Sequence, residues 1–139
     1  MIVVDTSFVY ALLDRHDARH REAARWYGSS DEEIATTPLV LAEIDHLAGA
    51  RAGAAARDAF RADLAAGAYD VSWWAGAEAQ AAEVARRYDD LGLDLTDASL
   101  VTLAARVGTD ALATFDARHF RAVVPLAHAA AFRLLPSDA

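Results

Sequence analysis

Short apolar runs and longer stretches of helical periodicity alternate along this chain. The short runs are rich in β-branched and small apolar residues, as in buried strands, and they span 2–4, 33–36, 69–71, 111–115 and 132–135. Between them, apolar residues recur every three or four positions, as in helices, over 8–13, 17–27, 38–48, an Ala- and Arg-rich segment ending at 64, 75–91 and 97–107. This alternation predicts an α/β fold, a three-layer α/β/α sandwich with a mainly parallel central sheet and right-handed crossovers.

Two helix starts carry capping signals. Thr37 suits an N-cap, and Pro38 suits the first helical position, where its missing N–H needs no partner. Thr96 is expected to be the N-cap of the helix that ends near Val107. These signals mark where the helical periodicity begins in each case.

Length and composition restrict the class of protein. A chain of 139 residues suits one domain, so we expect a single domain over 1–139. The 13 cationic residues are all Arg and stand against 21 acidic ones, giving a net charge of −8, which argues against a basic protein that wraps nucleic acid. An anionic substrate would therefore need a local attraction, either a bound divalent cation or a cluster of arginines. The lack of cysteine excludes disulfides, thiolate nucleophiles, iron–sulfur clusters and cysteine-ligated zinc.

The N-terminal segment and the hydropathy point to the cytoplasm. Residues 1–4 are apolar, but no basic segment precedes them and no cleavage site of small residues follows, unlike in a signal peptide. No apolar stretch approaches the roughly twenty residues that a membrane span requires. We therefore expect a soluble, cytoplasmic protein with no membrane partner.

Two acidic residues lie at the ends of predicted strands. Asp5 comes directly after 2–4, and Asp116 follows 111–115. In a parallel sheet both would lie at the carboxyl ends of the strands, where ligands bind in α/β folds. Each also has an ordinary structural explanation, because Asp5 can cap the next helix and Asp116 can belong to a turn.

Two further acidic residues lie on the apolar faces of predicted helices. Glu43 projects into the apolar stripe of 38–48, where an unpartnered carboxylate is energetically costly. Asp97 lies on the apolar face of its helix, whereas Ser99 and Thr102 are expected on the opposite side. The alternatives are a buried salt bridge from Glu43 to an arginine and a favourable interaction of Asp97 with the helix dipole.

The predicted fold brings these four carboxylates together. The sheet sends Asp5 and Asp116 to one edge, and Glu43 and Asp97 face inward from helices packed there. Mutual repulsion would raise some of their pKa values until protons bind, unless cations neutralise the cluster. Ligation by oxygen atoms, without His or Cys, favours Mg²⁺, with Mn²⁺ as a substitute, over zinc. Such a metal would supply the positive charge that an acidic protein needs to bind a phosphodiester.

Four segments that contain these acids resemble the acidic motifs of PIN-domain nucleases. They are Val3-Val4-Asp5-Thr6-Ser7, Leu41-Ala42-Glu43-Ile44, Leu95-Thr96-Asp97-Ala98-Ser99-Leu100 and Ala113-Thr114-Phe115-Asp116, followed by His119-Phe120. Their order and the chain length are most similar to the VapC-type ribonuclease toxins of bacterial toxin–antitoxin pairs. The resemblance places the catalytic and metal-binding acids of the family on Asp5, Glu43, Asp97 and Asp116, with none missing.

The resemblance implies a Mg²⁺-dependent endoribonuclease that forms homodimers and is inhibited by a small cognate antitoxin. The expected reaction is in-line attack of a metal-activated water on an RNA phosphodiester, leaving a 5′-phosphate and a 3′-hydroxyl. By the same analogy, a short amphipathic segment of the antitoxin docks in an apolar groove, for which the helices of 39–64 are the expected walls.

Two other functions remain open at this point. An aspartyl phosphatase would use Asp5 as a covalent nucleophile. That class expects a second Asp two residues later, where this chain has Ser7, and a lysine, which this chain lacks. A non-catalytic binding module would instead use the acids to hold arginines of a partner.

Several other polar residues have more than one interpretation. Thr6 and Ser7 either bind the scissile phosphate or a metal-bound water, or satisfy N–H groups of their own helix. Asp94 either assists a metal through a water molecule or is a loop acid or a partner of the helix start, and the last two are expected. His16 and His20, although spaced like zinc ligands, are expected to be exposed. Arginines near the acidic motifs either bind RNA phosphates or balance surface acids; these are Arg15, Arg118 and Arg121.

Overall fold

The computed structural model describes residues 1–127 and 129–139, and within these ranges it has a five-stranded sheet in the order β3-β2-β1-β4-β5. The strands are β1 (Ile2–Val4), β2 (Ile34–Thr36), β3 (Asp70–Val71), β4 (Ala111–Ala113) and β5 (Arg133–Leu135). Every neighbouring pair is parallel, and in the central pairs Val3 lies opposite Ala35 and Leu112. The predicted parallel sheet is confirmed.

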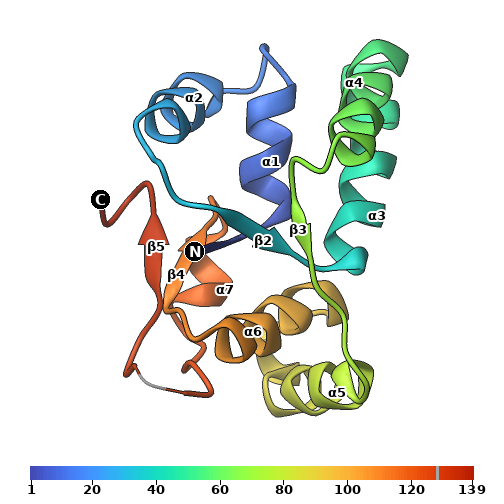
Figure 1. Cartoon of the computed structure of the whole chain (residues 1–139). Helices are drawn as coiled ribbons and strands as arrows, with labels where there is room; N and C mark the ends of the chain where they lie inside the picture. Colours follow the sequence, from blue (N-terminus) through green and yellow to red (C-terminus); the bar gives the residue numbers. More distant parts are fainter. Residues whose placement is uncertain (128) are drawn as a thin grey trace.

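Helices cover both faces of this sheet. They are α1 (Thr6–Leu13), α2 (His20–Gly28), α3 (Pro38–Leu47), the π-helical turn η1 (Ala48–Ala52), α4 (Ala54–Ala65), α5 (Ala77–Arg87), the 3₁₀ turn η2 (Asp89–Leu91), α6 (Leu95–Val107) and α7 (Ala117–Phe120). The chain crosses the sheet in one direction from β1 to β3 and in the other from β3 to β5, so right-handed crossovers place α1–α4 and α5–α7 on opposite faces. Figure 1 shows these layers above and below the sheet, which confirms the predicted sandwich. Among the described helices, α7 was not predicted, because four residues are too few to show helical periodicity.

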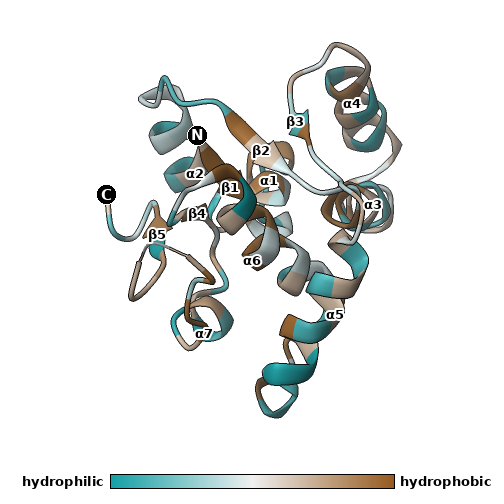
Figure 2. Ribbon diagram, turned by 60° about the horizontal axis from the view of Figure 1, so that its bottom comes forward, coloured by the Kyte–Doolittle hydropathy of each residue, from teal (hydrophilic) through white to brown (hydrophobic). Residues whose placement is uncertain are grey.

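The core lies against the inner strands of the sheet, with β1 and β4 at its centre. Every residue of β1 and β4 is buried, and the largest buried side chains include Phe8, Phe60 and Phe120. Figure 2 shows hydrophobic residues gathered on the central strands, whereas much of α5 is hydrophilic. Burial on both faces explains why these two strands are continuous apolar runs in the sequence. In the part of the chain that is described, no helix has the length and hydrophobicity to cross a lipid bilayer.

The helix that carries Asp97 begins earlier than predicted. Its N-cap is Asp94, not Thr96, because the Asp94 carboxylate accepts a hydrogen bond from the Asp97 N–H at 2.8 Å and α6 starts at Leu95. A carboxylate is as good an N-cap as a hydroxyl, and it also complements the positive end of the helix dipole. Of the roles considered for Asp94, the one at the helix start is confirmed, and Asp97 lies in the first turn of α6.

Thr37 caps α3 and Pro38 is its first residue, as predicted. The Thr37 hydroxyl also lies 2.8 Å from the Ser99 hydroxyl, which joins α3 to α6. The expectation that Ser99 and Thr102 lie opposite the apolar face is wrong, because both are buried. α6 packs against α5, α3 and β1, so its middle, residues 98–104, has no solvent-facing side. Thr37 and backbone carbonyls satisfy the two hydroxyls.

Candidate active site

A cleft opens at the carboxyl ends of β1 and β4. The direction of the chain across the sheet changes between these two strands, which makes their ends the switch point where ligands bind in such folds. The cleft has a volume of about 350 Å³. All four predicted acids line it, and the other lining residues are Thr6, Ser7, Tyr10, Asp17, Arg19, Leu47, Arg51, Asp94, Phe115 and His119. The structure therefore brings Asp5, Glu43, Asp97 and Asp116 to one place from four different elements and loops.

Asp5 is held by hydrogen bonds to both carboxylate oxygens. Its Oδ1 accepts the Thr6 N–H at 2.7 Å, and its Oδ2 accepts the hydroxyls of Ser7 and Thr114, each at 2.7 Å. Burial raises the pKa of Asp5, and the hydrogen bonds from Ser7 and Thr114 oppose this rise because they stabilise the charged form. The side chain also caps α1, so the structural explanation of Asp5 holds alongside any chemical one.

The two hydroxyls also tie the ends of β1 and β4 together. The Ser7 Oγ accepts the Phe115 N–H at 2.9 Å, and the Thr114 Oγ1 accepts the Asp116 N–H at 2.9 Å. The two hydroxyl oxygens are 3.2 Å apart. We call Asp5, Ser7 and Thr114 the hydroxyl side of the cleft, and backbone groups fix its geometry before any ligand binds.

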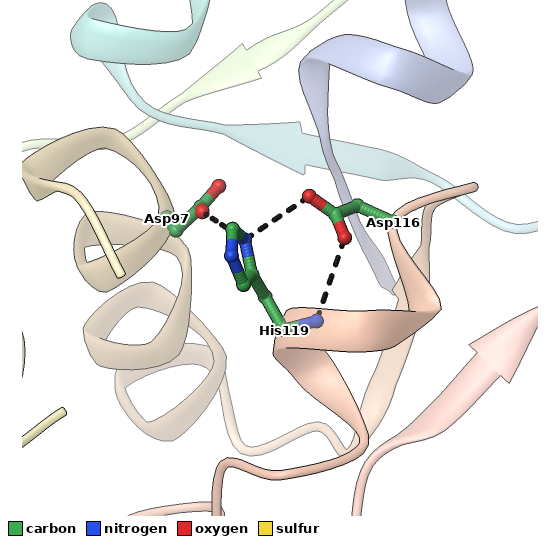
Figure 3. A group of neighbouring side chains, drawn as sticks. All are labelled: Asp97, Asp116 and His119. Atoms are coloured by element: carbon green, nitrogen blue, oxygen red, sulfur yellow. Dashed lines mark hydrogen bonds and ion pairs between the residues drawn. The ribbon is translucent and has the colours of Figure 1, made fainter. Parts of the chain in front are cut away.

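Asp97, Asp116 and His119 form a tight group in the same cleft. Asp97 comes from α6, Asp116 caps α7, and the His119 ring lies between the two carboxylates (Figure 3). The His119 Nδ1 is 3.2 Å from an Asp97 oxygen and 3.1 Å from an Asp116 oxygen. One potential ligand atom from each residue lies within 4.8 Å of the other two. Sequence reasoning missed His119 as a member, although its spacing of three residues from Asp116 was the available signal.

The remaining acids of the cleft repel one another. Burial raises the pKa of Asp97 to about 8, and four neighbouring carboxylates add to the rise; they are Asp5, Asp94, Asp116 and Glu43. Burial likewise raises the pKa of Glu43, with smaller contributions from the charges of Asp94 and Asp5. We call Asp97, Asp116 and Glu43 the carboxylate side of the cleft.

Glu43 lies at the edge of the buried face of α3 rather than in its middle. Val40 and Ile44 are fully buried, whereas Glu43 is half-buried and lines the cleft together with Leu47. Within residues 1–127 and 129–139, no ion pair joins Glu43 to an arginine, so the salt-bridge explanation of this residue is not supported.

Arginines that form ion pairs in the described ranges do so away from the predicted acids. Their partners are Glu22, Asp45, Asp58, Glu83 and Asp138. Arg121, one of the arginines near an acidic motif, donates to Asp138 at 2.7 Å and so balances a surface acid. The four predicted acids therefore have no guanidinium partner among the described residues.

The donor set of the cleft fits a divalent cation. Carboxylate oxygens are the ligands that Mg²⁺ and Mn²⁺ prefer, and a histidine nitrogen suits transition metals such as Mn²⁺ better than Mg²⁺. The His119 Nδ1 atom is buried and lies near two carboxylates, but it forms no hydrogen bond with the described residues. The carboxylate oxygens are close enough but are not in the direction that a hydrogen bond from this nitrogen requires. The sequence predicted a site with oxygen ligands only. The structure adds one nitrogen atom, His119 Nδ1, next to these oxygens. Thr6 Oγ1 is another buried polar atom of the cleft wall that lacks a hydrogen bond within the described chain.

The two histidines with zinc-like spacing form no group of three metal ligands within the described ranges. His16 is exposed, as expected, whereas His20 is half-buried because its Nδ1 lies 2.7 Å from the Ala11 carbonyl oxygen. This contact joins the start of α2 to α1, which is a structural reason for a histidine at this position.

Comparisons with known proteins agree with the geometry. The model of the PIN domain family matches residues 2–124. Ribonuclease VapC26 of Mycobacterium tuberculosis is 34% identical over 126 residues, which cover 90% of this chain and 93% of that protein. The crystal structure of VapC20 from M. tuberculosis, described as a toxin that cleaves the sarcin–ricin loop, superposes with a TM-score of 0.78 at 32% identity, covering 84% of this chain and 90% of that one.

Proposed function

The chain belongs to the PIN-domain family, and on that basis we propose that it is a Mg²⁺-dependent endoribonuclease that acts as the toxin of a toxin–antitoxin pair, with Mn²⁺ as a substitute metal. The name of the similar ribonuclease and the description of the similar toxin support RNA as the substrate class. The observation that carries the proposal is the convergence of Asp5, Glu43, Asp97 and Asp116 in one cleft, where none of them has a guanidinium partner in the described chain. Such a cluster favours binding of an external cation.

We assign metal binding and catalysis to Asp5, Glu43, Asp97 and Asp116, with His119 beside them. When bound, the cation would supply positive charge for the phosphodiester and activate a water molecule, so that hydrolysis leaves a 5′-phosphate and a 3′-hydroxyl. Asp5 is oriented in advance by its hydrogen bonds. Asp97 and Glu43, whose pKa values are raised by burial and by neighbouring carboxylates, would hold the cation in their charged forms, which positive charge in the cleft stabilises.

An aspartyl phosphatase fits this cleft less well. Both oxygens of Asp5 accept hydrogen bonds, which lowers their nucleophilicity, whereas Oδ1, with a single hydrogen bond, keeps a lone pair for a metal ion. At the position where that class has a second acid, Ser7 donates its hydroxyl to Asp5.

From the family we also propose the partners. The protein would act in the cytoplasm as a homodimer of single-domain subunits spanning 1–139, under the control of a small cognate antitoxin. An amphipathic segment of the antitoxin would dock along the helices of 39–64, with an arginine reaching the acids. Glu43, Leu47 and Arg51 belong to this region and line the cleft, so a segment bound there would cover it.

The test uses antitoxin-free protein with total RNA and with an RNA oligonucleotide that folds as the sarcin–ricin loop. We expect cleavage with Mg²⁺ or Mn²⁺ and none with EDTA, and sequencing of new 5′ ends by a phosphate-dependent ligation should locate the cut. Asp97→Asn should abolish the cleavage, while Asp89→Asn, at an exposed position outside the cleft, should not. RNA left intact with both metals would overturn the proposal, and hydrolysis of a small phosphomonoester instead would favour the phosphatase.

A further inference from the structure

An aromatic ring and a guanidinium group meet in the cleft beside the acids. The Arg19 guanidinium carbon lies 5.3 Å from the centre of the Phe115 ring, and both residues line the cleft. Phe115 stands between Thr114 and Asp116 in the loop after β4, while Arg19 precedes the first residue of α2. The pair therefore adjoins the candidate catalytic acids but belongs to neither side of the cleft defined above.

Phe115 is held rigidly in this place. Its backbone N–H donates to the Ser7 Oγ, and its ring stacks on Phe8 with centroids 5.9 Å apart and an interplanar angle of 29°. Phe8 is fully buried and meets Trp26 edge to face at 5.4 Å. A half-buried ring with such support loses little conformational entropy when a flat ligand stacks on it.

Arg19, in contrast, is held weakly. Its side chain is 59% exposed, and its ion pair with Glu22, at 3.2 Å, lies at the surface, where such pairs contribute little. Arg51 also lines the cleft, and within the described residues it forms no ion pair. In a cleft with six lining acids, these two guanidinium groups are the positive charges available to a polyanion.

We propose that Phe115 and Arg19 bind the nucleotide next to the scissile phosphate: the exposed Arg19 side chain moves off the Phe115 ring, the base stacks on the ring face that this frees, and the Arg19 guanidinium holds the phosphate. This inference rests on the proposed ribonuclease function. Aromatic rings and guanidinium groups together bind single-stranded RNA in this way, with little dependence on sequence because every base has a flat face. The pair thus sets where the backbone enters the cleft, so that the next phosphate reaches the acids.

The test compares Phe115→Leu and Arg19→Ala with matched controls on α2. The controls are Tyr27→Leu and Arg25→Ala, which remove an exposed aromatic ring and an exposed guanidinium outside the cleft. Binding of a fluorescent single-stranded RNA is measured by anisotropy in EDTA, with all variants in the Asp97→Asn background so that RNA stays intact. We expect about tenfold weaker binding for each cleft variant, the effect of losing one stacked base or one phosphate contact, and less than about twofold for the controls.

Salt dependence separates the two roles. Arg19→Ala should make the slope of log K against log salt concentration shallower by about 0.7, the value for one phosphate contact on a single strand, whereas Phe115→Leu should leave the slope unchanged. Phe115→Tyr should restore binding, because the flat ring is retained, which a purely structural role of the phenyl packing against Phe8 would not require. In the cleavage assay with active protein, both cleft variants should raise KM more than they lower kcat.

The outcomes distinguish this inference from the proposed function. Cleavage by wild-type protein together with unchanged RNA affinity in both cleft variants would overturn the inference and leave the ribonuclease function standing. Weakened binding that is equal in the cleft variants and the controls would also overturn it, because it would indicate a general charge or folding effect. Wild-type protein that neither cleaves nor binds RNA would overturn both.

Discussion

At the ends of β1 and β4, Asp5 accepts three hydrogen bonds, two of them from the hydroxyls of Ser7 and Thr114. In the same cleft, Asp97 has other carboxylates as its electrostatic neighbours, and its pKa rises to about 8. The protein itself supplies the partners of the hydroxyl side, whereas the charged form of the carboxylate side is stabilised only when positive charge arrives. The cleft thus combines a preorganised side, held by hydrogen bonds, with a side whose carboxylates repel one another. A bound cation can relieve this repulsion.

The largest expected effect comes from removing a charge on the carboxylate side. Asp97→Asn should lower RNA cleavage on the order of a hundredfold or more, because a candidate metal ligand is lost. It should also remove the rise in melting temperature that Mg²⁺ or Mn²⁺ gives the wild-type protein, measured by differential scanning fluorimetry. Asp89→Asn, a solvent-exposed acid on η2, should keep both properties. A metal response that survives Asp97→Asn would mean that the ion binds elsewhere.

The same residue predicts how metal-free stability depends on pH. An acid with a folded-state pKa of about 8 and an unfolded value of 3.8 holds its proton only in the folded state between these pH values. The free energy of unfolding should therefore fall as the pH rises from 5 to 8, by on the order of 2–4 kcal/mol. Urea unfolding in EDTA at the two pH values measures this change. Asp97→Asn should flatten the dependence, and an unchanged slope in that variant would contradict the assignment.

On the hydroxyl side, one hydroxyl can be removed at almost constant volume. Thr114→Val deletes a donor to Asp5 and an acceptor for the Asp116 N–H, so we expect about 1–2 kcal/mol lower stability and about tenfold slower cleavage. Thr102→Val is the matched control, since Thr102 is equally buried but donates to the Ser99 carbonyl within α6. It should cost about 1 kcal/mol and leave cleavage unchanged. Equal loss of activity in both variants would indicate a general effect of stability.

The smallest effect is expected far from the cleft, where an acid has its own guanidinium partner. The Arg121 guanidinium lowers the pKa of Asp138 to about 2, so the pair stabilises the fold above the unfolded pKa of 3.8 and loses this as the pH falls toward 2. Arg121→Ala should lower the melting temperature slightly at pH 7 and not at pH 2, with cleavage unaffected. This is the opposite pH dependence from that of Asp97. A loss of cleavage would instead give Arg121 a role in RNA binding.

The elements and their order were predictable from local patterns, whereas the partners of single residues were not. β1 and β4 are apolar runs because both of their faces are buried, and this burial is visible in the sequence itself. Ser99 and Thr102 were misplaced because helical periodicity assumes one solvent-facing side, which residues 98–104 of α6 lack between α5, α3 and the sheet. Thr96 was mistaken for the cap of α6 because Asp94 and Thr96 are both good cap residues, and only the hydrogen bond to Asp97 distinguishes them.

The amino-acid order alone determined the α/β class and sent Asp5 and Asp116 to one edge of a sheet, because parallel strands all end on the same side. Only the tertiary structure decided that His119 stands between Asp97 and Asp116, that hydroxyls from two strands share Asp5, and that Arg19 covers Phe115. The distances between these residues depend on how loops and helices pack against one another. The periodicity of the sequence predicts which face of a helix or strand a residue lies on, but not its distance from a residue on another element.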